Sequence, residues 1–272
     1  MQAAAFGYIQ QMVKQQAGIV VEPGKEYLAE SRLSGFAKEQ GFATLDNFVD
    51  TLRLSPYSET HRRVIELLTT NETSFFRDFR PFEALRQTII PQLVAARPGR
   101  NLTIWCAASS SGQEPYSLAM LIREHFPALV PTTRIIASDI SREMLARTKD
   151  GTYSQFEIGR GLPAPMLAKY LVSNGAQWQM RPEVRAMIET REINLAVAFP
   201  AMSAIDILMV RNVLIYFDAA KKQDILTRMR KVLSHDGILI LGGAETTLGV
   251  DVGFDRCTAE NKAAWYRRKD AK

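Results

Sequence analysis

Two acidic residues follow short apolar runs, at positions where α/β proteins keep the polar groups that hold a ligand. Residues 102–106 form an apolar, β-branched run, and Glu114 comes after it, beyond a turn of small residues. Asp139 ends the next such run, residues 134–138. An acid at the end of the second strand of an α/β sheet can accept hydrogen bonds from both hydroxyls of a ribose. The sequence therefore predicts a ligand that contains a nucleoside.

The turn before Glu114 indicates which nucleoside. A dinucleotide site needs the pattern G-x-G-x-x-G, because the pyrophosphate must approach bare backbone at a helix N-terminus. This turn contains one glycine, Gly112, and the carboxylate of Glu114 would repel a phosphate. S-adenosylmethionine (SAM) has an adenosine, an ammonium and a sulfonium but no phosphate, so it suits such a loop. When the loop is taken alone, a first-turn acid that complements the helix dipole explains Glu114 equally well.

The composition is that of an ordinary globular protein. The chain has 272 residues, of which 46% are hydrophobic and 23% charged, enough for one large domain or two modest ones. It has no apolar run of 18 residues and no signal-peptide pattern, which predicts a soluble, cytoplasmic protein without membrane insertion. The two cysteines cannot form a zinc site alone, and the histidines lack metal-ligand spacing, so we expect no metal.

The charge is basic overall and unevenly distributed. The formal net charge is +5, yet residues 1–72 carry a net charge of −2, which leaves +7 for the remainder. No basic run is interleaved with aromatic residues. The excess is therefore weak support for nucleic-acid binding, and we expect no nucleic-acid partner.

Residues 1–70 predict a small N-terminal all-helical domain, because apolar residues recur there at helical spacing. The segment that follows is unusually polar and supplies an amide, a hydroxyl and a guanidinium from Asn71, Thr73 and Arg77. Two interpretations are possible: these groups line a cleft between two domains, or they cap the helix expected from about Asp78. The residues alone favour capping.

Strands alternate with helices through most of the remaining chain, which predicts an α/β fold with a parallel sheet. The alternation breaks at residues 152–192, where 177–180 and 184–188 predict a small antiparallel hairpin, and it resumes at residues 193–195. Residues 254–268 predict a terminal antiparallel hairpin. Such a hairpin beside a parallel sheet is the usual ending of SAM-dependent methyltransferases, and dehydrogenase domains usually lack it.

Together these segments resemble the CheR family of chemotaxis receptor methyltransferases over nearly the whole chain. The matching stretches are residues 70–77 (TNETSFFR), 107–117 (AASSSGQEPYS), 137–140 (ASDI) and 211–218 (RNVLIYFD). The resemblance implies a helical domain over residues 1–70 and a Rossmann-like SAM-dependent methyltransferase domain over 71–272. The second domain would carry an antiparallel C-terminal hairpin and a small antiparallel β insertion at about 152–192.

The family transfers the methyl group of SAM to glutamate side chains on the cytoplasmic domains of chemoreceptors, forming γ-methyl esters for sensory adaptation. The resemblance implies that Glu114 binds the methionine ammonium and that Asp139 holds the ribose. It also places the polar linker against the cofactor, which replaces the capping interpretation. The implied cofactor-binding residues are Asn71, Thr73, Arg77, Glu114, Asp139, Asn194, Leu195, Asn212 and Val213, and the implied catalytic residues beside the methyl group are Arg77 and Tyr216.

The chain departs from the family pattern in two places. Gln113 stands where members often carry glutamate. Some members also have a glycine-rich extension in the inserted hairpin that docks a peptide at the receptor's C-terminus. Here the turn has only Asn174 and Gly175, so we expect this tether not to be used.

Two other functions stay open at this point. The first is a SAM-dependent methyltransferase that acts on RNA or a small molecule, favoured only by the basic charge. The second is a non-catalytic, SAM-responsive signalling module that binds partners through its helical domain.

Overall fold

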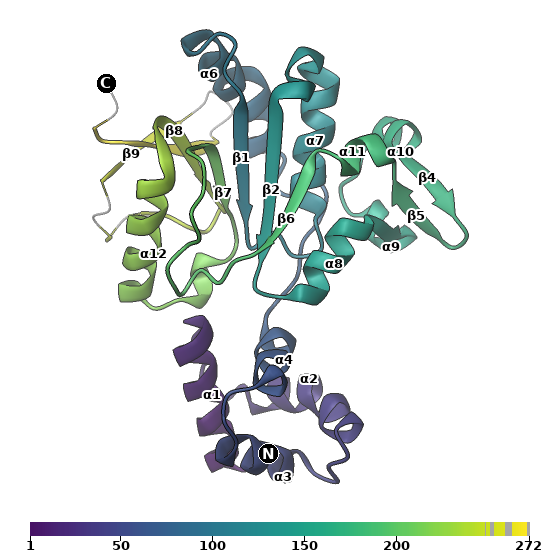
Figure 1. Cartoon of the computed structure of the whole chain (residues 1–272), viewed down its shortest axis with the longest axis vertical. Helices are drawn as coiled ribbons and strands as arrows, with labels where there is room; N and C mark the ends of the chain where they lie inside the picture. The colour runs from purple at the N-terminus through teal and green to yellow at the C-terminus, as the bar shows by residue number, and fades with distance from the viewer. Residues whose placement is uncertain (248, 251–252, 259–262, 271–272) are drawn as a thin grey trace.

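The computed structural model describes residues 1–247, 249–250, 253–258 and 263–270. These residues form a seven-stranded sheet flanked by helices, an all-helical N-terminal domain and a small three-stranded sheet. The helical domain lies beyond the arrowhead end of β1, and the small sheet projects to one side (Figure 1). Within the described ranges, no helix is both long enough and apolar enough to cross a membrane.

The N-terminal domain is all-helical, as predicted. Thr44 caps one of its helices by accepting a hydrogen bond from Asn47 N at 3.2 Å, and Gly18 ends another with φ 70°. Phe6, Ile9 and Leu33 are among the apolar residues buried between the helices. The four helices are α1 (Ala3–Ala17), α2 (Glu26–Glu39), α3 (Leu45–Leu54) and α4 (Glu59–Leu68).

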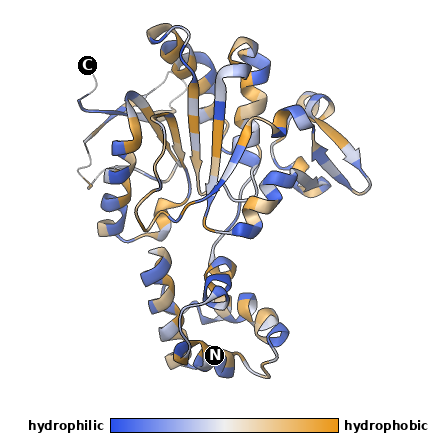
Figure 2. Ribbon diagram, in the orientation of Figure 1, coloured by the Kyte–Doolittle hydropathy of each residue, from blue (hydrophilic) through white to orange (hydrophobic). Residues whose placement is uncertain are grey.

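Five neighbouring strands of the main sheet are parallel, in the order β6-β2-β1-β7-β8 from one edge. Every residue of β1 and β7 is buried, as expected for strands covered on both faces. Figure 2 shows β1 and β7 mostly in apolar colours at the middle of the sheet. The strands are β1 (Leu102–Ala107), β2 (Thr133–Asp139), β6 (Ile188–Glu192), β7 (Ile205–Val210) and β8 (Leu233–Leu241).

The helices of this domain begin where the sequence predicts. The helix expected from about Asp78 consists of α5 (Arg80–Ala84), a π-helical segment η1 (Leu85–Ile89) and α6 (Ile90–Ala96). Pro91, just after the π-helical segment, cannot donate a backbone hydrogen bond. The other main helices are α7 (Gln113–His125), α8 (Arg142–Asp150) and α12 (Ala219–Val232).

The terminal hairpin is confirmed. β9 (Phe254–Thr258) pairs antiparallel with β10 (Ala264–Arg268). β10 in turn pairs antiparallel with β8, with Tyr266 opposite Leu239. The turn at residues 259–262 lies outside the described residues.

The small antiparallel sheet of the insertion is present, but the predicted pairing was wrong. β5 (Gln177–Met180) pairs with β4 (Leu171–Asn174) on one side and β3 (Thr152–Ser154) on the other. Pro182 starts a helical turn, α11 (Pro182–Arg185), because it favours the first position of a helix. The following residues then form β6, which pairs in parallel with β2 in the main sheet. The main sheet thus resumes at Ile188, earlier than the expected 193–195.

The insertion packs tightly against the linker that precedes α5. The Phe75 and Tyr153 rings meet edge to face, with centroids 5.0 Å apart. Tyr153 also donates a hydrogen bond to Ser111 O at 2.7 Å. Gly161 has φ 93°, and a Cβ built on it would collide with the carbonyl oxygen of Phe75. The short helix α9 (Gln155–Gly159), which ends just before Gly161, is therefore fixed relative to the linker.

We expect Gly161→Ala to lower the free energy of unfolding by about 2–4 kcal/mol, because strained backbone and steric overlap add. Gly175→Ala is the matched control, since Gly175 also has positive φ, 62°, but no atom within 4 Å of its built Cβ. The control should lose only about 1 kcal/mol. Chemical denaturation of both variants measures the difference, and equal losses would contradict the close packing.

Candidate active site

A pocket lies at the carboxyl edge of the parallel strands, where the helical domain meets the sheet. It spans about 990 Å³, open solvent at its mouth included, at the upper end of the range for small-molecule sites. Its walls come from the ends of β1, β2, β6 and β7, from α1 and from the linker. All the expected site residues line it: Asn71, Thr73, Arg77, Glu114, Asp139, Asn194, Leu195, Asn212, Val213 and Tyr216.

Asp139 ends β2 and is only 5% exposed. Its Oδ2 accepts a hydrogen bond from Ser110 N and its Oδ1 one from Ser141 N, both at 2.9 Å. Burial raises the pKa of Asp139, and the backbone hydrogen bonds oppose that shift. A carboxylate can accept about four hydrogen bonds, so the group can still accept one from a ligand hydroxyl.

Glu114 lies in the first turn of α7 and forms a buried ion pair that the sequence analysis missed. Arg211 Nη1 donates to Glu114 Oε2 at 2.7 Å, and Arg211 Nη2 donates to Asp78 Oδ2 at 2.8 Å. The Arg211 side chain is 2% exposed. Two carboxylates around one guanidinium leave a net charge of −1. The site can therefore still attract one cation, although Arg211 already pairs with Glu114.

Cys106 lies beside Glu114 and is fully buried. Burial raises the pKa of the Cys106 thiol well above its usual range, and the charge of Glu114 adds to that shift. The group is therefore a neutral thiol and not a nucleophile.

The polar linker lies over the loop that follows β1. Ser110 Oγ donates to Asn71 O at 2.7 Å, and Arg77 Nη1 donates to Glu72 O at 3.0 Å. Arg32 of α2 fixes the start of the linker by donating to Leu68 O and Thr69 O at 2.7 and 2.9 Å. The N-cap of α5 is Phe79, whose side chain has no polar atom. The capping interpretation of the linker was therefore wrong.

Backbone strain concentrates in the segments around the pocket. The non-glycine residues with positive φ among the described residues all lie in three segments: the linker, the loop after β1 and the loop after β7. Each such residue costs about 1–3 kcal/mol and persists only where its surroundings hold it, and such residues cluster at functional sites. The residues are Phe76, Asp78, Phe79, Ala108, Ser110 and Asn212.

Two of the expected site residues also tie the helical domain to the sheet. Asn194 Nδ2 donates to Gln16 O at 2.7 Å, at the end of α1. The backbone oxygen of Tyr216 accepts a hydrogen bond from Val20 N at 2.8 Å. The Asn194 amide is thus already engaged with the chain and helps to hold α1 against the pocket.

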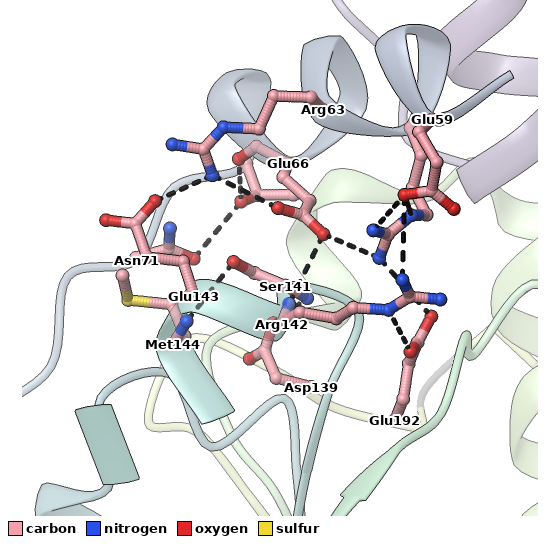
Figure 3. A network of polar contacts seen from close by, with 12 residues as sticks. Glu59, Arg63, Glu66, Asn71, Asp139, Ser141, Arg142, Glu143, Met144 and Glu192 are labelled. Atoms are coloured by element: carbon pink, nitrogen blue, oxygen red, sulfur yellow. Dashed lines mark hydrogen bonds and ion pairs between the residues drawn. The ribbon is translucent and has the colours of Figure 1, made fainter. Parts of the chain in front are cut away.

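A second tie between the domains is an ion-pair cluster around Glu66 (Figure 3). Glu66 is 5% exposed and accepts hydrogen bonds from Arg62 and Arg63, each at 3.1 Å. It also accepts one from Arg142 N at 3.3 Å, at the start of α8, three residues after Asp139. The outer pairs of the cluster include Arg63 with Glu143 at 2.7 Å and Arg142 with Glu192 at 2.6 Å. Because a buried carboxylate is costly without partners, this cluster favours the arrangement in which α4 closes the pocket.

Glu245 holds the loop that carries Asn212 and Tyr216, and the sequence analysis did not single it out. Its Oε2 accepts from Asn212 N and Gly242 N at 2.7 and 2.8 Å. Its Oε1 accepts from Val213 N and Leu214 N at 2.9 and 2.7 Å. The only signal in the sequence is an acid shortly after the end of a central strand. The carboxylate satisfies the backbone donors of the loop and holds Asn212 at its positive φ of 59°.

The pocket also contains groups that a ligand such as SAM could use. The hydroxyl of Ser109 lines the pocket and is buried without a hydrogen-bond partner among the described residues. A buried hydroxyl of this kind calls for a partner. With Asp139 at one end and the net negative group around Glu114 at the other, the residues fit a cationic nucleoside. The described residues hold no group of three or more His, Cys, Asp or Glu arranged for a metal ion.

Comparisons with known proteins agree with this reading of the pocket. A family model described as CheR methyltransferase, SAM binding domain, matches residues 71–263. A second, described as CheR methyltransferase, all-alpha domain, matches residues 4–69.

Three relatives match most of the chain. The chemotaxis protein methyltransferase Cher2 of Pseudomonas putida is 37% identical over 250 residues, which cover 90% of this chain and 91% of that protein. Chemotaxis protein methyltransferase 1 of Pseudomonas aeruginosa is 38% identical over 247 residues, covering 89% and 90%. The chemotaxis protein methyltransferase of Vibrio parahaemolyticus is 36% identical over 251 residues, covering 90% of each.

We expect Glu245→Gln to lower the free energy of unfolding by about 1–3 kcal/mol, because an amide nitrogen would face backbone donors that the carboxylate now satisfies. SAM affinity should fall as well, since the loop holding Asn212 loosens. Thermal melts and calorimetric titration measure the two effects, with Glu39→Gln on the exposed side of α2 as the control. Wild-type stability in Glu245→Gln would contradict this role.

Proposed function

The chain belongs to the CheR family of SAM-dependent chemotaxis methyltransferases, and from this premise we propose that it methylates glutamate side chains of chemoreceptors. The products would be glutamate γ-methyl esters on the receptors' cytoplasmic domains, and the enzyme would act in the cytoplasm without a C-terminal receptor tether. The observation that carries the proposal is the pocket. The pocket brings three features together at one edge of the sheet: Asp139, the negative group around Glu114, and the guanidinium of Arg77.

The pocket residues divide between the two ends of the cofactor. Asp139 would accept hydrogen bonds from the ribose hydroxyls, with Asn194 and Leu195 beside the adenine. Glu114 would hold the methionine ammonium, because Arg211 neutralises only one of the two carboxylates, Glu114 and Asp78, that it contacts. The rest of the wall around the cofactor would be formed by Asn71, Thr73, Asn212 and Val213. When bound, SAM supplies a methyl group activated by a sulfonium.

The reaction places few chemical demands on the protein. A glutamate side chain with an ordinary pKa near 4.3 is already ionised at neutral pH, so the nucleophile needs no general base. The residues that line the pocket include no histidine and no cysteine, which agrees with that requirement. Catalysis then consists of positioning and of excluding water, for which effective molarities can reach about 10⁵ M.

Arg77 and Tyr216 are the residues we place beside the transferred methyl group. Arg77 would orient the incoming carboxylate through charge-assisted hydrogen bonds, and Tyr216 would shape the side of transfer. A carboxylate that is fully paired is a poorer nucleophile, so the contact with Arg77 should orient the substrate without neutralising it. Arg77 is half-buried and donates to the backbone of its own linker, which leaves its other N–H groups for a substrate.

The receptor assay tests the proposal directly. Incubation with labelled SAM and a chemoreceptor cytoplasmic fragment should give base-labile methyl esters on glutamate. Label in total RNA, with steep salt dependence, would instead support an RNA methyltransferase. SAM binding without turnover on the receptor fragment, RNA or small molecules would support a non-catalytic signalling module. Either result would overturn receptor methylation.

Arg77→Ala should lose most of its turnover, by about a hundredfold, while SAM affinity weakens only a few-fold, because Arg77 acts mainly on the substrate carboxylate. Single-turnover kinetics and calorimetric SAM titration separate the two effects. Arg123→Ala, on α7 and outside the pocket, is the control. Wild-type turnover in Arg77→Ala would remove this residue from the mechanism.

A further inference from the structure

At the rim of the pocket, one arginine pairs with the carboxylate of Glu72 and a second, Arg77, donates to the backbone oxygen of the same residue at 3.0 Å. Glu72 Oε1 accepts a hydrogen bond from Arg160 Nη2 at 2.8 Å. The positive charge of Arg77 also acts on Glu72, and Arg160 first and Arg77 second lower the pKa of Glu72. Two guanidinium groups and one carboxylate leave a net charge of +1. We call Glu72, Arg77, Arg160 and the neighbouring Phe156 the entrance cluster.

The entrance cluster has the opposite sign to the group inside the pocket. Arg211 with Glu114 and Asp78 carries a net charge of −1, which suits a cation. The entrance cluster, at +1, suits an additional carboxylate. A glutamate methyltransferase must hold a cationic cofactor and an anionic substrate side by side, and the two clusters provide the two signs next to each other.

The arginine from the insertion is held in a fixed place relative to the pocket. Arg160 directly follows α9, and the next residue, Gly161, packs against the carbonyl of Phe75 without room for a Cβ. Phe75 is two residues before Arg77 in the linker. The insertion therefore presents Arg160 beside Arg77 as a built feature of the fold.

The surface around Arg160 is open to a partner. The side chains of Arg160 and Glu72 are 41% and 61% exposed. Phe156 is 73% exposed, and Arg160 Cζ lies 5.8 Å from the centre of its ring. Exposed ion pairs contribute little to stability, so Glu72 can be displaced from Arg160 by another carboxylate. An apolar ring beside an exchangeable guanidinium fits an amphipathic, acidic segment.

We propose that Arg160 and Phe156 dock the acidic helical segment of the receptor that carries the methylated glutamate, and that Glu72 occupies Arg160 until a receptor carboxylate displaces it. Arg77 takes the reacting glutamate, Arg160 takes a second carboxylate on the same face of the receptor helix, and Phe156 packs against an apolar residue of that face. This inference rests on the proposed function and identifies the surface on which the receptor would bind.

The test compares four variants in steady-state methylation of a receptor cytoplasmic fragment at saturating SAM. Arg160→Ala should raise KM for the receptor about fivefold to tenfold and change kcat less than twofold, because the lost contact is made in binding. The KM of Arg160→Lys should lie between those of Arg160→Ala and the wild type, since a point charge replaces the guanidinium. Glu72→Gln should lower KM about twofold, because the internal competitor is gone. The control Arg123→Ala should have the same KM and kcat as the wild type.

Salt dependence gives a second readout that a structural role would not move. The effect of Arg160→Ala on KM should shrink as salt rises from about 0.05 M to about 0.5 M, because screening weakens exposed charge contacts. KM within twofold of wild type in Arg160→Ala would overturn the proposal. A rise in KM in Glu72→Gln equal to that in Arg160→Ala would also overturn it, since the pair would then be structural.

A direct binding measurement separates this inference from the proposed function. Fluorescence anisotropy of a labelled receptor fragment, with S-adenosylhomocysteine present, reports docking without methyl transfer. Weaker binding to Arg160→Ala than to the wild type supports the docking surface even if no methyl ester forms. Absence of binding to the wild type, or equal binding to both, overturns it.

Discussion

Hydrogen bonds from backbone N–H groups to a few carboxylates hold the carboxyl edge of the sheet in shape. Asp139 accepts from Ser110 and Ser141, and Glu245 accepts from four backbone donors around Asn212. Glu66 reaches from the helical domain to the first turn of α8. Buried backbone donors must find partners, and these three acids supply them at the ends of the strands. The pocket owes its form to these contacts.

The charges at this edge are arranged in small groups of opposite sign. The trio of Glu114, Asp78 and the buried Arg211 carries −1, and the trio of Glu72, Arg77 and Arg160 at the rim of the pocket carries +1. A buried charge needs compensation, and partial compensation leaves each group able to bind one ligand charge. We propose that this arrangement lets a sulfonium cofactor and a carboxylate substrate meet without a catalytic base.

Much of the fold could be predicted from local patterns, because buried parallel strands, helical apolar spacing and a terminal hairpin leave strong periodic signals. The sequence analysis misplaced β6, because a short, partly polar edge strand has the same pattern of polar and apolar residues as a strand of a hairpin. The sequence also located the residues that the pocket brings together, whose individual roles remain predictions. Arg211 and Glu245 were missed, because their partners lie 97 and about 30 residues away in the chain and only folding makes them neighbours.

Calorimetric titration of SAM into the wild type and Asp139→Ala tests the central claim most directly, with Asp236→Ala as a control at the opposite edge of the sheet, where Asp236 pairs with Arg97. We predict that the wild type and Asp236→Ala bind SAM alike and that Asp139→Ala binds at least about tenfold more weakly, since it loses charge-assisted hydrogen bonds to the ribose. Equal affinity in Asp139→Ala, or no binding to the wild type, would contradict the account.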